Sequence, residues 1–127
     1  MSDEAAIFDQ EQFELLFEKD NDELLRLLGK EVTSNRVGVR PLTPREYVAK
    51  AKAWLIGFKE RVRCRICSDD FVLKYLKAPE NSRRVDIASA VFDIVSVASG
   101  APVPAMYVTV LILREGVESI CVNENDK

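Results

Sequence analysis

The most regular hydrophobic pattern in this chain lies in its second half. Polar residues recur there at spacings of three, four and three, at Asp86, Ser89, Asp93 and Ser96, and nearly every residue between them is apolar. On an α-helix this spacing produces one narrow polar stripe, whereas on a strand Asp86 and Asp93 would point to opposite faces. The pattern therefore predicts a helix at about 83–99 that other elements bury on most of its sides.

The N-terminal part predicts two short helices, or one bent helix, over about 10–28. Asp9 is a suitable N-cap, with Gln12 completing a capping box and Phe8 in position for a hydrophobic staple. Gly29 is the expected C-cap of the second helix.

The clearest helix start in the chain is Thr43-Pro44-Arg45-Glu46, which has a capping residue, a proline at the first helical position and a glutamate at the third. It predicts a helix over about 44–67 with its apolar face repeated at helical spacing: Tyr47, Ala51, Trp54, Phe58 and Val62. A further short helix, capped by Ser68, is expected to end at about Lys77.

The segment from 105 to 122 allows two interpretations. Its apolar positions follow a helical period from Met106 to Ile120, and Pro104 could occupy the first helical position. Its valine and isoleucine content instead suits a β-hairpin, in which Tyr107–Leu113 and Val117–Val122 pair around a three-residue loop. Because the other predicted elements are all helices, we favour the helix and keep the hairpin as the alternative.

Together these patterns predict an all-α fold, with five to six short helices packed around a buried central helix at about 83–99. A chain of 127 residues with 47% hydrophobic residues is one domain with a single core. Within this 1–127 domain we expect a loop at 30–42 and flexible tails at 1–8 and 123–127.

The sequence favours a cytoplasmic location. Residues Met1 to Glu4 are acidic where a secretory leader would be positive, and polar residues interrupt the apolar runs, so no membrane partner is expected. Three cysteines, an odd number, suit a reducing compartment better than a disulfide framework.

The residues that could carry chemistry indicate a protein that is not an enzyme. The chain has no histidine, which removes the commonest general base and metal ligand. Cys64 and Cys67 form a CxxC motif, but Cys121 is the only other cysteine, so a four-ligand zinc site lacks ligands. We therefore expect no metal and no cofactor, and we interpret the CxxC pair as two buried or half-buried thiols. Asp86 and Asp93 are two turns apart, a long separation for one acid–base site.

Charge is unevenly distributed along the chain, although the net charge is only −3. Residues 1–31 carry 3 basic and 10 acidic side chains, whereas residues 32–84 carry 13 basic and 5 acidic ones. Four of the cations align on one face of the 44–67 helix, and Trp54 lies at the margin of its apolar face. The candidate interaction surface is therefore Arg45, Lys52, Trp54, Lys59 and Arg63.

These observations favour a non-catalytic protein–protein interaction module, such as a small adaptor, regulator or subunit that binds another protein or forms an oligomer. The apolar load of residues 85–113 supports this hypothesis, because we expect part of it to remain on the surface for a partner. The alternative is a regulator that binds nucleic acid through the basic helix face. A small enzyme or metal-binding protein is the third hypothesis.

Overall fold

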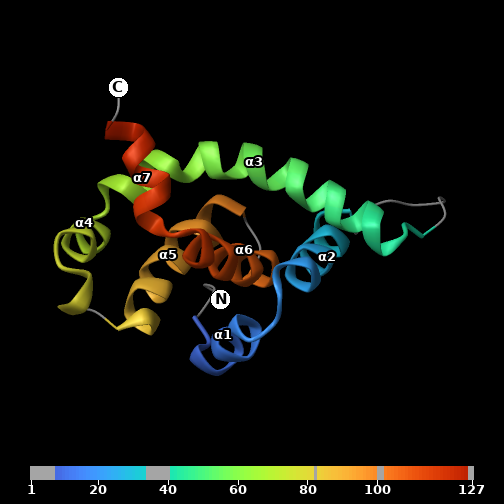
Figure 1. Ribbon diagram of the computed structural model, residues 1–127, viewed down its shortest axis with the longest axis horizontal. Coiled ribbons are helices and arrows are strands. Elements are labelled where there is room, and N and C mark those ends of the chain that lie inside the picture. Colours follow the sequence, from blue (N-terminus) through green and yellow to red (C-terminus); the bar gives the residue numbers. More distant parts are fainter. Residues whose placement is uncertain (1–7, 34–40, 82, 100–101, 126–127) are drawn as a thin grey trace, which may run out of the picture.

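The computed structural model describes residues 8–33, 41–81, 83–99 and 102–125, and within these ranges the chain forms seven α-helices, one short 3₁₀ turn and no strand (Figure 1). The predicted all-α fold is confirmed. Most of the tail expected at 1–8 and most of the loop expected at 30–42 lie outside the described residues. In the C-terminal tail expected at 123–127, residues 123–125 are instead the last part of the final helix. The helices are α1 (Gln10–Phe17), α2 (Asn21–Val32), α3 (Pro44–Ser68), α4 (Asp70–Lys77), α5 (Arg84–Ser99), α6 (Pro102–Glu115) and α7 (Val117–Asn125).

The start of α1 follows the sequence signals closely. The carboxylate of Asp9 accepts a hydrogen bond from the backbone N–H of Gln12 at 3.1 Å. Phe8 packs on Phe13 with ring centroids 5.5 Å apart, as a hydrophobic staple requires, and it also reaches Phe92 of α5 at 5.7 Å. The staple therefore attaches the beginning of α1 to the core.

Gly29 has a different role from the expected C-cap. The helix α2 continues past it to Val32, and Gly29 lies where α2 crosses α3. A Cβ atom placed on Gly29 would be 2.1 Å from the carbonyl oxygen of Tyr47. Glycine is needed here because the two helix backbones approach more closely than any side chain allows.

Side chains cap the start of α3 and the start of the next helix, α4. Thr43 and Glu46 form the predicted reciprocal capping box at the start of α3. Asp69 rather than Ser68 caps α4, by accepting hydrogen bonds from the N–H groups of Phe71 and Val72. The Ser68 hydroxyl instead donates to the carbonyl oxygen of Cys64, one turn earlier.

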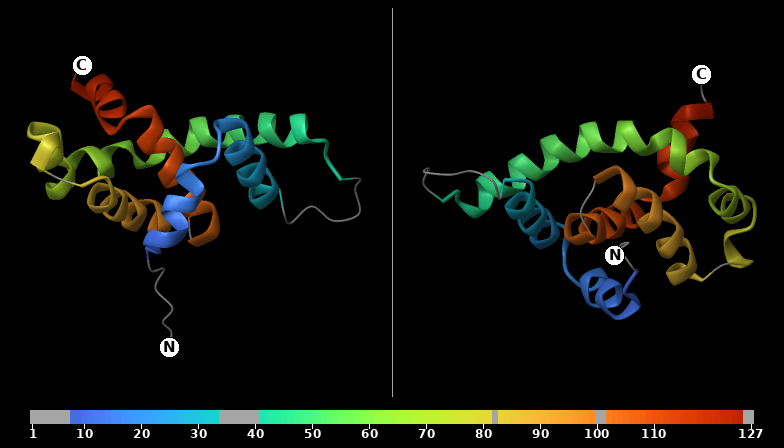
Figure 2. Two further views of the ribbon diagram at one scale, coloured as in Figure 1. Left: turned by 60° about the horizontal axis from the view of Figure 1, so that its bottom comes forward. Right: turned by 180° about the vertical axis from the view of Figure 1, so that it is seen from behind.

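The core lies where α5 and α6 pack against each other beneath α3 (Figures 1 and 2). The helix predicted at 83–99 is α5, which buries Ile87, Ala88, Val91, Phe92 and Val95. α6 is more fully enclosed, because it packs against α1, α2, α5 and α7. Most of the apolar side chains that the structure describes in 85–113 are thus buried or half-buried, although Val97 of α5 is 72% exposed.

The C-terminal segment is helical, and the alternative of a β-hairpin is wrong. It forms two helices, because Gly116 adopts a φ of +104° and separates α6 from α7. The side chains of Val117, Ile120 and Cys121 on α7 are buried. This short helix closes the core beside α3.

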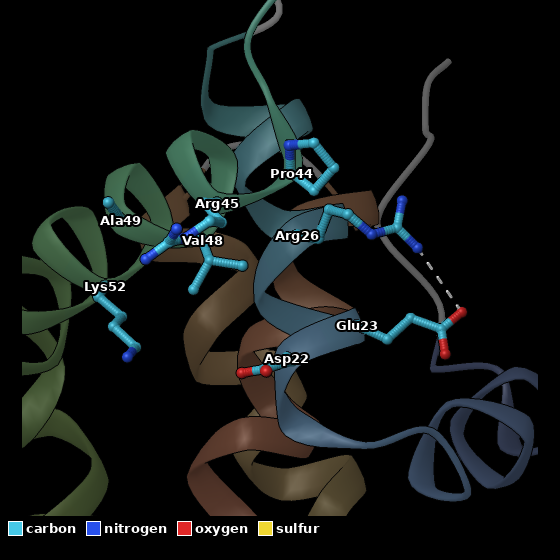
Figure 3. A pocket seen from close by; sticks show the side chains of 8 residues that line it. All are labelled: Asp22, Glu23, Arg26, Pro44, Arg45, Val48, Ala49 and Lys52. Carbon is cyan, nitrogen blue, oxygen red and sulfur yellow. Dashed lines mark ion pairs between the residues drawn. The ribbon is translucent and has the colours of Figure 1, made fainter.

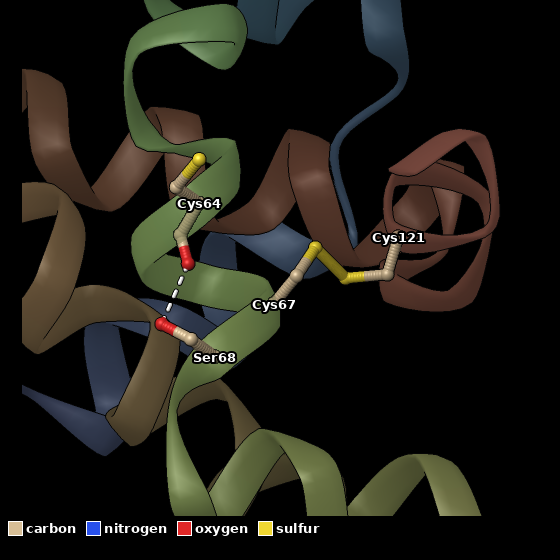
Figure 4. The surroundings of a disulfide bond; sticks show 4 residues. All are labelled: Cys64, Cys67, Ser68 and Cys121. Carbon is tan, nitrogen blue, oxygen red and sulfur yellow. Dashed lines mark hydrogen bonds between the residues drawn. A yellow bond between two sulfur atoms is a disulfide. The ribbon is translucent and has the colours of Figure 1, made fainter. Parts of the chain in front are cut away.

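The interpretation of the CxxC motif as two helical thiols is wrong. Cys67 forms a disulfide with Cys121, which joins the end of α3 to α7 with 5.5 Å between the two Cα atoms (Figure 4). Cys64 is exposed and lies outside this bond. Sequence spacing could not reveal the pairing, because the two cysteines are 54 residues apart and meet only in the folded chain.

Candidate interaction site along α3

The four cations of the predicted surface lie in two different environments. Lys59 forms an ion pair with Glu115 at the end of α6, with 2.6 Å between Nζ and Oε1, and Arg63 pairs with Glu60 on its own helix. Arg45 and Lys52 are exposed, and no described residue forms an ion pair with either of them. The first half of α3 therefore offers the cations that are most accessible to a partner.

A cavity of about 730 Å³ lies between the beginnings of α2 and α3. Figure 3 shows Arg45 and Lys52 extending from α3 beside Val48, while Glu23 and Arg26 extend from α2 and pair with each other. The described residues that line it are Asp22, Glu23, Arg26, Pro44, Arg45, Val48, Ala49 and Lys52. Three cations and two carboxylates among these residues give the cavity a small excess of positive charge.

A second cavity of about 340 Å³ adjoins the first, since Lys52 lines both. Its apolar part comes from three helices: Leu25 of α2, Leu55 and Ile56 of α3, and Leu111 of α6. Its polar lining consists of Asn21, Lys52, Lys59, Arg114 and Glu115. An apolar floor with a polar, mainly basic rim is typical of the centre of a protein interface.

The face of α3 that lines these two cavities carries a regular sequence of side chains. Arg45, Ala49, Lys52, Ile56 and Lys59 follow one another at spacings of four, three, four and three, which places them along one face of the helix. We call these five residues the α3 strip. Ile56 exposes 66% of its surface, so it forms an apolar patch between two lysines. This alternation of three and four is the spacing by which helices pack side by side.

Trp54, the fifth predicted residue, is separated from the cations. It is half-buried and stacks on Phe58 with ring centroids 4.7 Å apart, in contact with the core. It lines neither of the two cavities. The apolar residue of the surface is Ile56 instead of Trp54. Ile56 follows Ala49 by seven residues, or two helical turns, and this spacing on the face of the cations could have identified it from the sequence.

The aspartates of α5 line neither of these two cavities. Asp86 and Asp93 line another cavity together with Asp69, the N-cap of α4. Arg83 donates two hydrogen bonds to the Asp86 carboxylate and holds its pKa below the usual value. Among the described residues, no group of three or more carboxylates and thiols is placed to hold a metal ion.

Comparisons with protein-family models, with curated proteins and with solved structures find no significant match to this chain. Within the described ranges, none of the helices has both the length and the apolar character that a membrane span requires.

Proposed function

We propose that this chain is a non-catalytic protein-interaction module that binds a protein partner along α3. The observation that carries the proposal is the second cavity, where an apolar floor and an exposed Ile56 are enclosed by Lys52, Lys59 and Arg114. Burying such an apolar patch is the main favourable term in protein association, and the surrounding cations select the charge of the partner. An adaptor, a regulator or a subunit of a larger assembly would each use such a surface.

The details of the basic residues weigh against the nucleic-acid alternative. A protein that follows a phosphate backbone needs several unneutralised cations in a row. Here Glu115 and Glu60 already pair with Lys59 and Arg63, and the carboxylates of Asp22 and Glu23 line the cavity beside Arg45. Failure to bind duplex DNA or RNA at low salt would remove this alternative.

The disulfide also weighs against the cytoplasmic location expected from the odd number of cysteines. Stable disulfides are rare in the reducing cytosol and persist in oxidising compartments. Alkylation of thiols in intact cells, followed by mass spectrometry of the Cys67 and Cys121 peptides, would determine the redox state of the pair in its natural location.

Photo-crosslinking in cells tests the proposed function. A photoreactive amino acid in place of Ile56 is expected to form adducts with a protein partner, and the change Lys52→Glu in the same chain is expected to reduce them. The matched control is the same amino acid in place of Val97, an aliphatic residue of α5 that is 72% exposed and lines neither of the two cavities. If position 56 forms no more adducts than position 97, the proposed function is wrong.

A further inference from the structure

A second exposed strip, on α1, is complementary to the α3 strip. Glu11 and Leu15 of α1 and Glu18, its C-cap, are exposed and follow one another at spacings of four and three. We call these three residues the α1 strip. Leu15 exposes 61% of its surface, whereas Phe13 and Leu16 on the other side of α1 are buried. Because Leu15 adds nothing to the core, the fold does not explain why it is apolar.

The two strips match in spacing and are opposite in charge. Lys52, Ile56 and Lys59 repeat the spacing of four and three found in the α1 strip, with cations where α1 has carboxylates. Each set of three spans about 10 Å of helix rise and is centred on an exposed aliphatic residue. Equal spacing brings all three pairs of positions into register when the helices lie side by side.

We propose that the α3 strip binds the α1 strip of a second copy of this chain. This rests on the proposed function, because it identifies the occupant of the surface assigned there. α1 and α3 lie on opposite sides of the molecule, with α5 and α6 between them (Figure 1), so the two strips pair between copies. In this arrangement Leu15 of one copy enters the second cavity beside Ile56 of the next, and Glu11 and Glu18 lie against the lysines.

The charges of the described residues permit this pairing. None of the described residues forms an ion pair with Glu11, Glu18 or Lys52, so three of the four charges are available. Lys59 is paired with Glu115, but its ammonium group carries three donors and can accommodate a second carboxylate. The association is therefore expected to weaken as salt is added, since these groups are exposed.

The contact is small and of the head-to-tail type. One eight-residue helix contributes less than the roughly 800 Å² per partner of a standard interface, so the association is expected to be weak. Each copy that has used its α1 strip still presents its α3 strip. Such heterologous contacts form closed rings or open filaments rather than symmetric dimers.

Sedimentation velocity on purified protein, from about 10 µM to about 1 mM at low and high salt, tests the pairing. The wild type is expected to assemble with rising concentration, and Leu15→Asp and Ile56→Asp are each expected to remain monomeric. A mixture of these two variants retains one intact strip on each chain, so it is expected to form a 1:1 dimer and nothing larger. The control Val97→Asp changes an equally exposed aliphatic residue and is expected to assemble like the wild type.

Leu15, Ile56 and Val97 are all exposed, so each variant is expected to fold like the wild type. Circular dichroism checks this. A wild type that stays monomeric throughout, or two variants that do not pair when mixed, would overturn the proposal. If the purified chain is monomeric while position 56 crosslinks to a different protein, the second copy is the wrong occupant and the interaction function stands. If position 56 forms no crosslink and the chain is monomeric, both proposals are wrong.

Discussion

The side chain of Arg114 at the end of α6 holds the end of α1 through the backbone and ring of Phe17. Its guanidinium donates to the Phe17 carbonyl oxygen and lies over the aromatic ring, with 5.2 Å from Cζ to the ring centroid. The same group donates to the Asn21 side chain at 3.0 Å. Arg114 thus satisfies a backbone carbonyl that the end of a helix leaves without a partner.

Replacing Arg114 by lysine is expected to lower the free energy of unfolding by about 1–2 kcal/mol, because a single ammonium group cannot reproduce the two directed hydrogen bonds and the stacking. Urea denaturation measures the change. Arg65→Lys on the exposed side of α3 is the matched control and is expected to change stability by less than about 0.5 kcal/mol. Equal effects of the two substitutions would contradict the role of Arg114.

Two glycines inside helices are expected to respond to alanine in opposite directions. Gly29→Ala places a Cβ atom against the Tyr47 carbonyl, so α2 and α3 must separate, and we expect a loss of about 1–3 kcal/mol. Gly57 has no atom within 4 Å of the same position, and Gly57→Ala is expected to gain up to about 1 kcal/mol from helix propensity. Thermal unfolding of both variants checks the prediction, and stabilisation by Gly29→Ala would show that the helices do not approach so closely.

The disulfide between Cys67 and Cys121 is expected to stabilise the fold by about 4 kcal/mol, the value for a closed loop of this length in the unfolded chain. Reducing the wild type should therefore lower its midpoint of unfolding substantially. Cys121→Ala should show a lowered midpoint that no longer responds to reductant, and Cys64→Ala should behave like the wild type. A reductant effect in Cys121→Ala would mean that another pair of thiols is bonded.

Alkaline pH is expected to weaken the fold through Tyr107. Partial burial on α6, together with the nearby Glu31 carboxylate, raises the pKa of its phenol above the ordinary value of 10.0. The unfolded phenol loses its proton near pH 10 while the folded one retains it, so this contribution to stability is present below pH 10 and is lost as the pH rises through the folded pKa. Urea denaturation at pH 9 and 11 measures the loss, which should be smaller in Tyr107→Phe. An equal loss in both proteins would contradict the assignment.

The helices could be predicted because their signals are local. The capping box of Thr43 and Glu46 and the staple of Phe8 involve residues a few positions apart, and the backbone geometry of a helix fixes how they meet. The role of Gly29 depends on the distance between two helices, and that distance is a product of the whole fold. In the sequence, a glycine that ends a helix cannot be distinguished from a glycine that lets two helices approach closely.

The candidate site was predictable only in part for the same reason. The spacing of Arg45, Lys52 and Lys59 on one helix is visible in the sequence. The apolar floor is not, because Leu25 and Leu111 come from α2 and α6. Whether a lysine is neutralised also depends on distant residues, as the pair of Lys59 and Glu115 shows across 56 positions.

The bond between Cys67 and Cys121 also determines how the chain responds to a pulling force. Tension applied at the two ends would pass from α3 to α7 through the sulfur atoms, and α4, α5 and α6 would carry no load. The bond withholds 54 residues from extension, about 190 Å of contour length at about 3.5 Å per residue. Stretched in the presence of a reductant, a single molecule would lengthen by about that amount in one additional step.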